Sequence, residues 1–261
     1  MTDSDGFQPL STQTSPAVPF TARTATPQQK TARVHEIFET ISPTYDRMND
    51  VISCGMHRFW KKALVKDLTS QNAARILDVA SGTGDIALEI ARANTRAHIV
   101  ASDFSAGMLA VAQQRIAEEG LVIIEICEQD AMAMTFADGT FDASVISFGL
   151  RNMPDYAQVL REMARVTKPG GYVYCLDSSV PTNRLIRPFF TLYFKHLMPL
   201  LGRLVANAPS EYAWLYDSTE AFLTKRELAD LMRAVGLEDV SVKSHLFGSA
   251  ARHRGCKPFF V

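Results

Sequence analysis

The sequence predicts an α/β fold in three layers. Helices cover both faces of a mostly parallel, seven-stranded sheet that ends in a C-terminal antiparallel hairpin. Three observations predict it. Short apolar segments alternate with helical segments between residues 75 and 177, a pattern typical of parallel strands buried on both faces. A glycine-rich turn joins the first of these apolar segments to a helix. Near the C-terminus, two further apolar segments flank Gly248-Ser249, which predicts a hairpin turn.

Each predicted element has its own signal in the sequence. A helix begins at Pro27, carries apolar residues at positions 34, 37, 38 and 41 on one face, and ends at Ser42-Pro43. A second amphipathic helix contains Trp60 and Leu64, and Thr224 with Glu227 forms a capping box that starts a late helix. Strands are expected at residues 75–80, 98–102, 122–127, 141–147, 172–177, 240–247 and 251–258, with helices at 85–93, 105–118 and 155–167.

Length and composition predict one large domain with a polar tail. The 261 residues are 47% hydrophobic and 21% charged, which is ordinary for a globular protein with a full core. We expect a single domain over residues 30–261, with a helical cap at 30–70 and an apolar helical insertion or lid at 184–223. Residues 1–29 are rich in Thr, Ser, Pro and Gln, so we expect a flexible N-terminal tail there.

Charge and cysteine content argue against a nucleic-acid-binding protein and against a protein with a structural metal site. With 27 Lys and Arg against 28 Asp and Glu, the net charge of −1 gives no general attraction to nucleic acid. The four cysteines are scattered without a C-x-x-C pair, which favours reduced thiols in a cytoplasmic protein and no structural metal site. No segment reaches the roughly 18 uncharged apolar residues that a membrane-spanning helix needs.

The strongest local motif is the segment Leu77-Asp-Val-Ala-Ser-Gly-Thr-Gly-Asp85. Gly82 and Gly84 let a ligand approach the backbone closely, and the following helix offers free N–H groups to an anionic group. Asp103 ends the next strand, where a carboxylate suits the hydroxyls of a ribose. The spacing Gly82-x-Gly84-x-x-Ala87 also matches a dinucleotide fingerprint, so a nicotinamide-dependent oxidoreductase stays open on this motif alone.

Three further features favour another cofactor. Asp78 stands inside the first strand, Asp130-Ala131 follows the third strand, and Lys168-Pro-Gly-Gly171 turns into the fifth. Together with the glycine loop, they resemble the Rossmann-like class I S-adenosylmethionine-dependent methyltransferases.

That resemblance implies S-adenosyl-L-methionine as cofactor and gives each residue a role. Asp78 would support the loop and the amino end of the methionine, which the loop backbone and Thr83 would hold. Asp103 would bind the ribose, Asp130 and Ala131 would frame the adenine, and Ser147 at the end of the fourth strand would complete the site.

Other segments resemble a narrower family, the C-methyltransferases of ubiquinone and menaquinone biosynthesis. The likeness covers roughly residues 30–258, and its most specific parts are Tyr45-Asp-Arg-Met-Asn49 and Phe148-Gly-Leu-Arg-Asn152. It implies transfer of a methyl group to a ring carbon of the reduced, prenylated naphthoquinone that precedes menaquinol. Methylation of a ubiquinone precursor is the alternative within the family. The other matching segments lie at residues 38–44, 52–57, 193–202, 211–215 and 251–257.

This chemistry needs an electron-rich ring carbon, and therefore stabilisation of a ring oxyanion. Arg151 and Asn152, just past the fourth strand, are the candidates for this role. Tyr45 and Asp46 could close over the ring, with Asp46 or His57 accepting the proton. Structural interpretations stay open for four of them: Tyr45 in the core, Asp46 capping a helix, Arg151 in an ion pair, and His57 in a helical N-terminus.

The apolar segment 184–206 has two compatible interpretations. It could be a lid helix packed on the core, or a channel for the prenyl chain that also touches the cytoplasmic face of a membrane. Arg184, Arg187, Lys195 and Arg203 could face lipid headgroups, and a homodimer through this segment is left open.

Three rival functions also stay open. An O- or N-methyltransferase of another small molecule would share the cofactor site. A nucleic-acid methyltransferase is disfavoured because Ser147-Phe-Gly-Leu-Arg-Asn152 replaces Asn-Pro-Pro-Tyr at the end of the fourth strand. A non-catalytic scaffold would have lost residues such as Gly82 and Asp103, which are present.

Overall fold

The computed structural model describes residues 21–22, 25–41, 49–50, 53, 55–94, 96–193 and 209–259. Most of the tail predicted at residues 1–29 lies outside these ranges, as do Tyr45, Asp46 and the central part of the predicted insertion. The proposed roles of these residues therefore stay predictions. Within the described ranges no helix is both long and apolar enough to cross a membrane.

The sheet has the predicted seven strands in the order β3-β2-β1-β4-β5-β7-β6. Strands β1 to β5 are parallel, whereas β7 pairs antiparallel with both β5 and β6. The predicted C-terminal hairpin therefore forms one edge of the sheet. The strands are β1 (Arg75–Val79), β2 (His98–Asp103), β3 (Ile124–Glu128), β4 (Phe141–Ser147), β5 (Thr167–Ser178), β6 (Glu238–His245) and β7 (Ala250–Cys256).

Helices cover both faces of this sheet because each carries one apolar stripe. On one face, α3 (Met56–Thr69) and α4 (Asp85–Ala93) bury residues such as Leu64 and Ile90 against the strands. On the other face, α6 (Tyr156–Val166) and α10 (Lys225–Ala234) bury Leu160 and Met232. The helix α5 (Ala106–Glu119) packs against β2 and β3, and the capping box predicted at the start of α10 is present.

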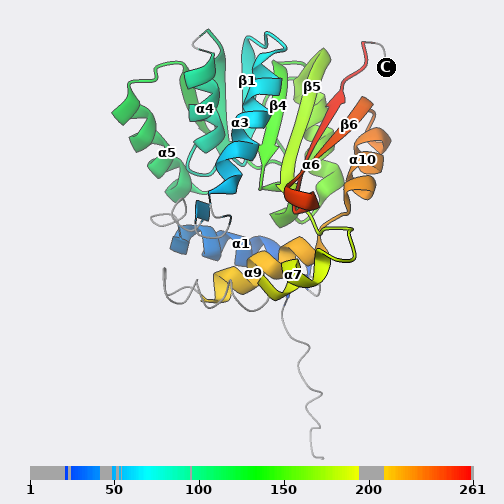
Figure 1. Cartoon of the computed structure of the whole chain (residues 1–261). Helices are drawn as coiled ribbons and strands as arrows, with labels where there is room; N and C mark the ends of the chain where they lie inside the picture. The colour runs from blue at the N-terminus through cyan, green and yellow to red at the C-terminus, as the bar shows by residue number, and fades with distance from the viewer. Residues whose placement is uncertain are drawn as a thin grey trace, which may run out of the picture.

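A third set of helices lies across the end of the sheet where β1 to β5 finish (Figure 1). It consists of α1 (Pro27–Ile41), α7 (Arg187–Leu192) and α9 (Pro209–Ala221). Lys30 of α1 anchors this layer, since its Nζ donates to the carbonyl of Met153 at 2.6 Å and to the Tyr156 hydroxyl at 3.1 Å. The ligand-binding edge of an open α/β sheet is thus roofed by helices from both ends of the chain.

Most predicted boundaries lie within two residues of the observed ones, and two of the differences have a clear structural reason. Strand β5 begins at Thr167 instead of residue 172, because the Lys168–Gly171 turn already pairs with its neighbours, including Gly170 N–H to the Lys257 carbonyl at 2.7 Å. The hairpin turns earlier than expected: the short helix η4 (Leu246–Gly248) has positive φ at Leu246 and Phe247, so β6 ends at His245.

Candidate active site

A small cavity of about 40 Å³ lies at the carboxyl ends of β1, β2 and β4, under α1. The chain turns sharply there, since Ala80 and Phe148 adopt positive φ values of 51° and 57° although neither is glycine. Non-glycine residues in this conformation are strained and concentrate at functional sites. The cavity is lined by Val34, Ala80, Gly82, Asp103, Phe104, Met108, Ser147, Phe148, Gly149, Asn152 and Met153.

Asp103 is the charged group of this cavity, at the end of β2. Its Oδ2 accepts the backbone N–H of Gly82 at 2.8 Å, and its Oδ1 accepts the N–H of Ser105 at 2.9 Å. The side chain is buried. These two bonds fix the carboxylate and tie the glycine loop to the neighbouring strand, which places Asp103 where the sequence predicted a ribose partner.

Gly82 and Gly84 have different structural reasons to be glycine. Both have positive φ, at 56° and 79°. A Cβ on Gly84 would lie 3.2 Å from the Cβ of Ala112 in α5, whereas a Cβ on Gly82 would meet nothing within 4 Å. Gly84 thus allows close packing of two helices, and Gly82 leaves open space beside the cavity.

Alanine substitutions should separate these two roles. Each variant has a backbone cost of about 1–2 kcal/mol for a left-handed residue. Gly84→Ala also adds a tight contact with Ala112, so thermal unfolding should show the larger loss of stability for Gly84→Ala. Gly82→Ala should instead lose more affinity for the cofactor, measured by calorimetry, than its lost stability explains. Equal effects of the two substitutions on both quantities would contradict this division.

Asp78 supports the start of α4. It is fully enclosed in β1, and its Oδ2 accepts the backbone N–H of Ala87 at 3.1 Å. Burial raises the pKa of this carboxyl group to about 8. The structure therefore shows Asp78 under the loop, and its predicted contact with the amino end of a methionine stays a prediction.

Thr83 is held by a cluster of charges that the sequence did not reveal. Its Oγ1 and its carbonyl accept from Nη1 of Arg115 at 3.1 and 2.9 Å. The same Arg115 nitrogen lies 2.7 Å from Asp85, and Lys61 donates to the other Asp85 oxygen at 2.7 Å. Burial alone would raise the pKa of Asp85, but the two cations hold it well below its usual range. One signal was visible, because Lys61 falls beside Trp60 and three residues before Leu64 on the buried side of α3.

Asp130 and Ala131 lie in the loop after β3, outside the lining of the small cavity. The exposed Asp130 carboxylate accepts the N–H of Met132 at 2.8 Å, and Ala131 is buried in the core. Their predicted adenine contacts therefore stay predictions.

Ser147, at the end of β4, supplies an independent sign of a ligand. Its hydroxyl is buried in the lining of the small cavity and has no hydrogen-bond partner among the described residues. Buried polar groups are normally paired, so an unpaired hydroxyl at a cavity wall points to a polar ligand there. Together with Asp103 and the glycine loop, it fits a group with ribose hydroxyls and a charged tail.

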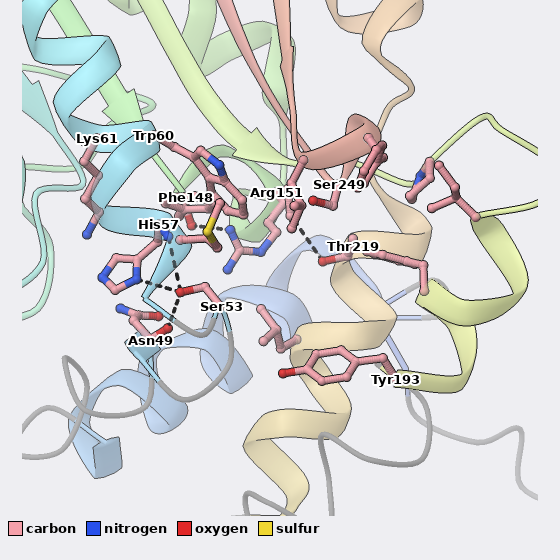
Figure 2. Close-up of a pocket in the computed structure, with 18 residues that line it drawn as sticks. Asn49, Ser53, His57, Trp60, Lys61, Phe148, Arg151, Tyr193, Thr219 and Ser249 are labelled. Atoms are coloured by element: carbon pink, nitrogen blue, oxygen red, sulfur yellow. Dashed lines mark hydrogen bonds between the residues drawn. The ribbon is translucent and has the colours of Figure 1, made fainter.

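Figure 2 shows the lining of a larger cavity of about 360 Å³, which shares one residue with the small cavity. Phe148 is the residue that lines both, so it forms the partition between them. Most of the larger cavity is apolar, and its walls come from α3, α7, α9 and η4. The lining residues are Asn49, Ser53, Met56, His57, Trp60, Lys61, Phe148, Arg151, Ser178, Pro181, Ile186, Phe190, Tyr193, Leu215, Thr219, Leu246, Phe247 and Ser249.

Arg151 is one of two buried cations that line this cavity, the other being Lys61. Its Nη1 donates to Asp177 Oδ1 and to the Phe148 carbonyl, both at 2.7 Å, while its backbone N–H donates to Asp177 Oδ2 at 3.1 Å. The structural ion pair considered for Arg151 is therefore present. Its Nη2 has no hydrogen-bond partner in the described part of the chain, which leaves a donor available at the cavity.

Asn152 does not share this position. Arg151 lines the larger cavity, whereas Asn152 lines the small one beside Asp103. Both belong to the short helix η2 (Leu150–Asn152), whose tight turn directs successive side chains apart. The sequence grouped these two residues for one role, and the structure places them in neighbouring cavities instead.

His57 is the second residue of α3, as its structural interpretation required, and it also lines the larger cavity. Its side chain is buried and its Nδ1 lies 2.7 Å from the hydroxyl of Ser53. Burial, followed by the nearby Lys61 ammonium, lowers the pKa of His57 to about 4, so the imidazole is neutral near pH 7.

Solved structures with the same fold include several methyltransferases. A SAM-dependent methyltransferase of Thermotoga maritima, titled a possible histamine N-methyltransferase, matches with a TM-score of 0.57 and 18% identity over 85% of this chain and 99% of its own. The [4+2]-cyclase SpnF matches with a TM-score of 0.59 and 19% identity over 90% of this chain and 97% of its own. The fold is thus that of the Rossmann-like methyltransferases, and SpnF illustrates that the fold alone does not fix the reaction.

Proteins found by sequence comparison have much higher identity to this chain than these solved structures. Demethylmenaquinone methyltransferase of Halalkalibacterium halodurans is 45% identical over 231 residues, which are 88% of this chain and 94% of the relative. The enzyme of the same name from Bacillus cereus is 44% identical over 232 residues, 88% of this chain and 98% of its own. The model of the ubiE/COQ5 methyltransferase family matches residues 26–257. With the glycine loop, Asp103 and the paired cavities in place, this match shows that the chain belongs to the ubiE/COQ5 methyltransferase family.

Proposed function

We propose that this chain is a demethylmenaquinone methyltransferase. It transfers the methyl group of S-adenosyl-L-methionine to a ring carbon of demethylmenaquinol and so produces menaquinol, the last step of menaquinone biosynthesis. The names of relatives at about 44% identity support the substrate. The observation that carries the chemistry is the arrangement of two adjoining cavities. One lies under the glycine loop and has Asp103, Ser147 and Asn152 in its lining, and the other is mostly apolar with a buried arginine.

The small cavity, at about 40 Å³, marks the ribose part of the cofactor site, because the whole cofactor is several times larger. S-adenosyl-L-methionine supplies an electrophilic methyl group on a sulfonium. Asp103 would accept hydrogen bonds from the ribose hydroxyls, and Gly82 would leave room for the ligand against the loop. Ser147 and Asn152 would provide polar contacts at the wall that faces β4. The helix α1 covers this site and would shield it from water.

The larger cavity is the acceptor site, and Arg151 is its oxyanion stabiliser. A reduced naphthoquinone carries a hydroxyl group beside the carbon that is methylated. Nη2 of Arg151 can hydrogen-bond that oxygen when its hydroxyl proton is lost or shared and the ring gains naphtholate character, while Asp177 keeps the guanidinium in place. Arginine stays protonated in proteins, so it stabilises the oxyanion and does not take the proton. Phe148 lines both cavities, so it would border the passage through which the methyl group reaches the ring carbon.

The apolar remainder of the cavity suits the prenyl chain. Phe190 of α7 lines it and is 8% exposed, whereas its neighbour Phe189 points outward and is 74% exposed. Leu192 of the same helix and Leu185 in the turn before it are also exposed, near Arg184 and Arg187. We infer that this outer surface rests on the membrane in which the acceptor is dissolved, with the two arginines toward lipid headgroups.

Phe189 and Phe190 offer a matched pair of alanine variants. Phe190→Ala should raise the KM for a long-tailed acceptor several-fold and leave that for a short-tailed acceptor nearly unchanged, because only the long tail reaches the apolar wall. Phe189→Ala should instead weaken sedimentation with anionic vesicles and leave the KM for a detergent-dispersed short-tailed acceptor unchanged. An equal effect of Phe190→Ala on both acceptors would exclude the channel.

Product analysis tests the proposed function directly. Purified protein, S-adenosyl-L-methionine and a chemically reduced short-tailed demethylmenaquinone should give a product heavier by one methylene unit, with the new methyl on the ring carbon by NMR. A methyl group found on oxygen would support the O-methyltransferase alternative. A reaction only with a ubiquinone precursor would show that the enzyme acts in ubiquinone biosynthesis instead.

A further inference from the structure

Methylation of a ring carbon leaves one chemical requirement unmet. The carbon that gains the methyl group still holds its hydrogen, and the ring becomes aromatic again only when that proton is removed. The proton needs an acceptor beside the ring. This requirement rests on the proposed function, and a side chain of the acceptor cavity would meet it.

Few side chains of the acceptor cavity can accept a proton. Among the described lining residues, the ionisable ones are His57, Lys61, Arg151 and Tyr193, and no carboxylate is present. Arg151 and Lys61 are cations in ion pairs. A phenol such as Tyr193 must first lose its own proton, which ordinarily happens near pH 10. His57 is the described lining residue that is neutral and has a basic nitrogen.

The hydrogen bonds of Ser53 determine which nitrogen of His57 is basic. The Ser53 hydroxyl lies 2.7 Å from the carbonyl oxygen of Asn49 and 2.7 Å from Nδ1 of His57. A hydroxyl has one hydrogen, and a carbonyl oxygen can only accept. The Ser53 hydrogen therefore goes to Asn49, and His57 must donate from Nδ1 to Ser53. In this tautomer Nε2 carries the lone pair.

The surroundings of Nε2 suit a group that gains a proton briefly. Nε2 makes no hydrogen bond within the described chain, and Asp50 Oδ1 is 3.9 Å away, beyond bonding distance but near enough to stabilise an imidazolium. Asp50 is itself held by Nε of Arg58 at 2.8 Å. Of the charges that face His57, Lys61 and Arg58 favour the neutral form, and Asp50 and Asp85 favour the charged form.

We propose that Nε2 of His57 is the general base that removes the proton from the methylated ring carbon, with Ser53 as its positioning residue. As the new carbon–carbon bond forms, the carbon–sulfur bond of the donor breaks and the ring loses its aromaticity. The proton then passes from the ring carbon to Nε2, and the electron pair of the C–H bond restores the aromatic ring. The imidazolium releases the proton to water. A weak base is sufficient because the recovery of aromaticity makes this C–H bond strongly acidic.

The test uses an acceptor deuterated at the reacting carbon. His57→Asn keeps an amide group near the position of Nδ1, and so the contact with Ser53, but has no basic nitrogen. We expect kcat to fall about 100-fold, within the usual range for loss of a general base, with the affinity for S-adenosyl-L-methionine unchanged. Proton removal should now be the slow step, so a primary deuterium isotope effect should appear in the variant and be absent in the wild-type enzyme.

Ser53 provides the control for positioning. Ser53→Ala removes the acceptor of the Nδ1 hydrogen and should lower kcat about tenfold, and Ser53→Thr, which restores a hydroxyl, should recover most of it. Independently of turnover, ¹⁵N NMR of the histidine rings should show His57 protonated at Nδ1. A purely structural role for His57 would give no isotope effect in His57→Asn.

Three results would overturn the assignment. The first is a His57→Asn enzyme with kcat within twofold of wild type and no isotope effect. The second is an isotope effect in Asp46→Asn but not in His57→Asn, which would assign the general base to Asp46. The third is an Nε2-protonated ring by NMR. If the wild-type enzyme itself methylates no quinol, the proposed function fails and the role of His57 falls with it, a result that the comparison with wild type distinguishes from the other three.

Discussion

Replacement of Arg151 by methionine is expected to lower kcat by about 10²–10³-fold, the range found when one donor of an oxyanion site is removed. The KM for the acceptor should change less, because Nη2 binds the ring oxygen most strongly when that oxygen carries negative charge. Cofactor affinity, measured by calorimetry, should stay within a few-fold of wild type, since Arg151 lines the acceptor cavity and not the small one.

A control for stability is essential in this experiment. Arg151→Met leaves the buried carboxylate of Asp177 without its cation, which costs about 3–5 kcal/mol when one partner of a buried ion pair is lost. The double variant Arg151→Met with Asp177→Asn removes both charges and should regain much of the stability in denaturant unfolding. It should not regain activity. Recovery of kcat in the double variant would show that Arg151 acts only through its ion pair.

Replacement of Asp103 by alanine is expected to raise the Kd for S-adenosyl-L-methionine at least 100-fold. Each hydrogen bond to a charged group is worth about 1.5–3 kcal/mol, and two would be lost with the ribose. The substitution also leaves the N–H groups of Gly82 and Ser105 without their acceptor, so the glycine loop loses its tie to β2. Calorimetry with the cofactor measures the effect.

Asp130→Ala is the matched comparison for Asp103→Ala. Asp130 is exposed, bonds within its own loop, and lies outside the lining of the small cavity, so its loss should raise the Kd less than tenfold. Equal losses from both substitutions would mean that the adenine end contributes as much binding energy as the ribose end. An unchanged Kd in Asp103→Ala would remove the small cavity as the cofactor site.

Much of the fold could be predicted because its signals are local. Alternation of apolar segments with amphipathic helices fixes a parallel sheet, and the Thr224–Glu227 capping box fixes the start of α10. The boundaries of β5 and the hairpin were less accurate, because Lys168–Gly171 and Leu246–Gly248 are shaped by pairing with distant residues and by positive φ values.

Site residues could be predicted only where their position along a strand determines that they lie at the ligand-binding edge of the sheet. Asp78, Asp103 and Ser147 stand in parallel strands or at their carboxyl ends, which meet at one edge of the sheet. The ion pairs of Arg151 with Asp177 and of Lys61 with Asp85 join residues 26 and 24 positions apart. The position of Lys61 on the buried side of α3 indicates that it needs a partner, but no local pattern indicates which residue that partner is. The separation of Arg151 from Asn152 depends on one tight turn, whose geometry the sequence does not specify.

The most direct test of the account compares the two redox forms of one acceptor. Purified protein would receive S-adenosyl-L-methionine labelled in the methyl group and a short-tailed demethylmenaquinone, either reduced with dithionite or oxidised. We expect labelled product in the organic phase only from the quinol. Only the quinol has an electron-rich ring carbon, and only its ring oxygen can become an anion that Arg151 stabilises. Equal labelling of the quinone, or no labelling of the quinol by protein that binds the cofactor, would contradict this expectation.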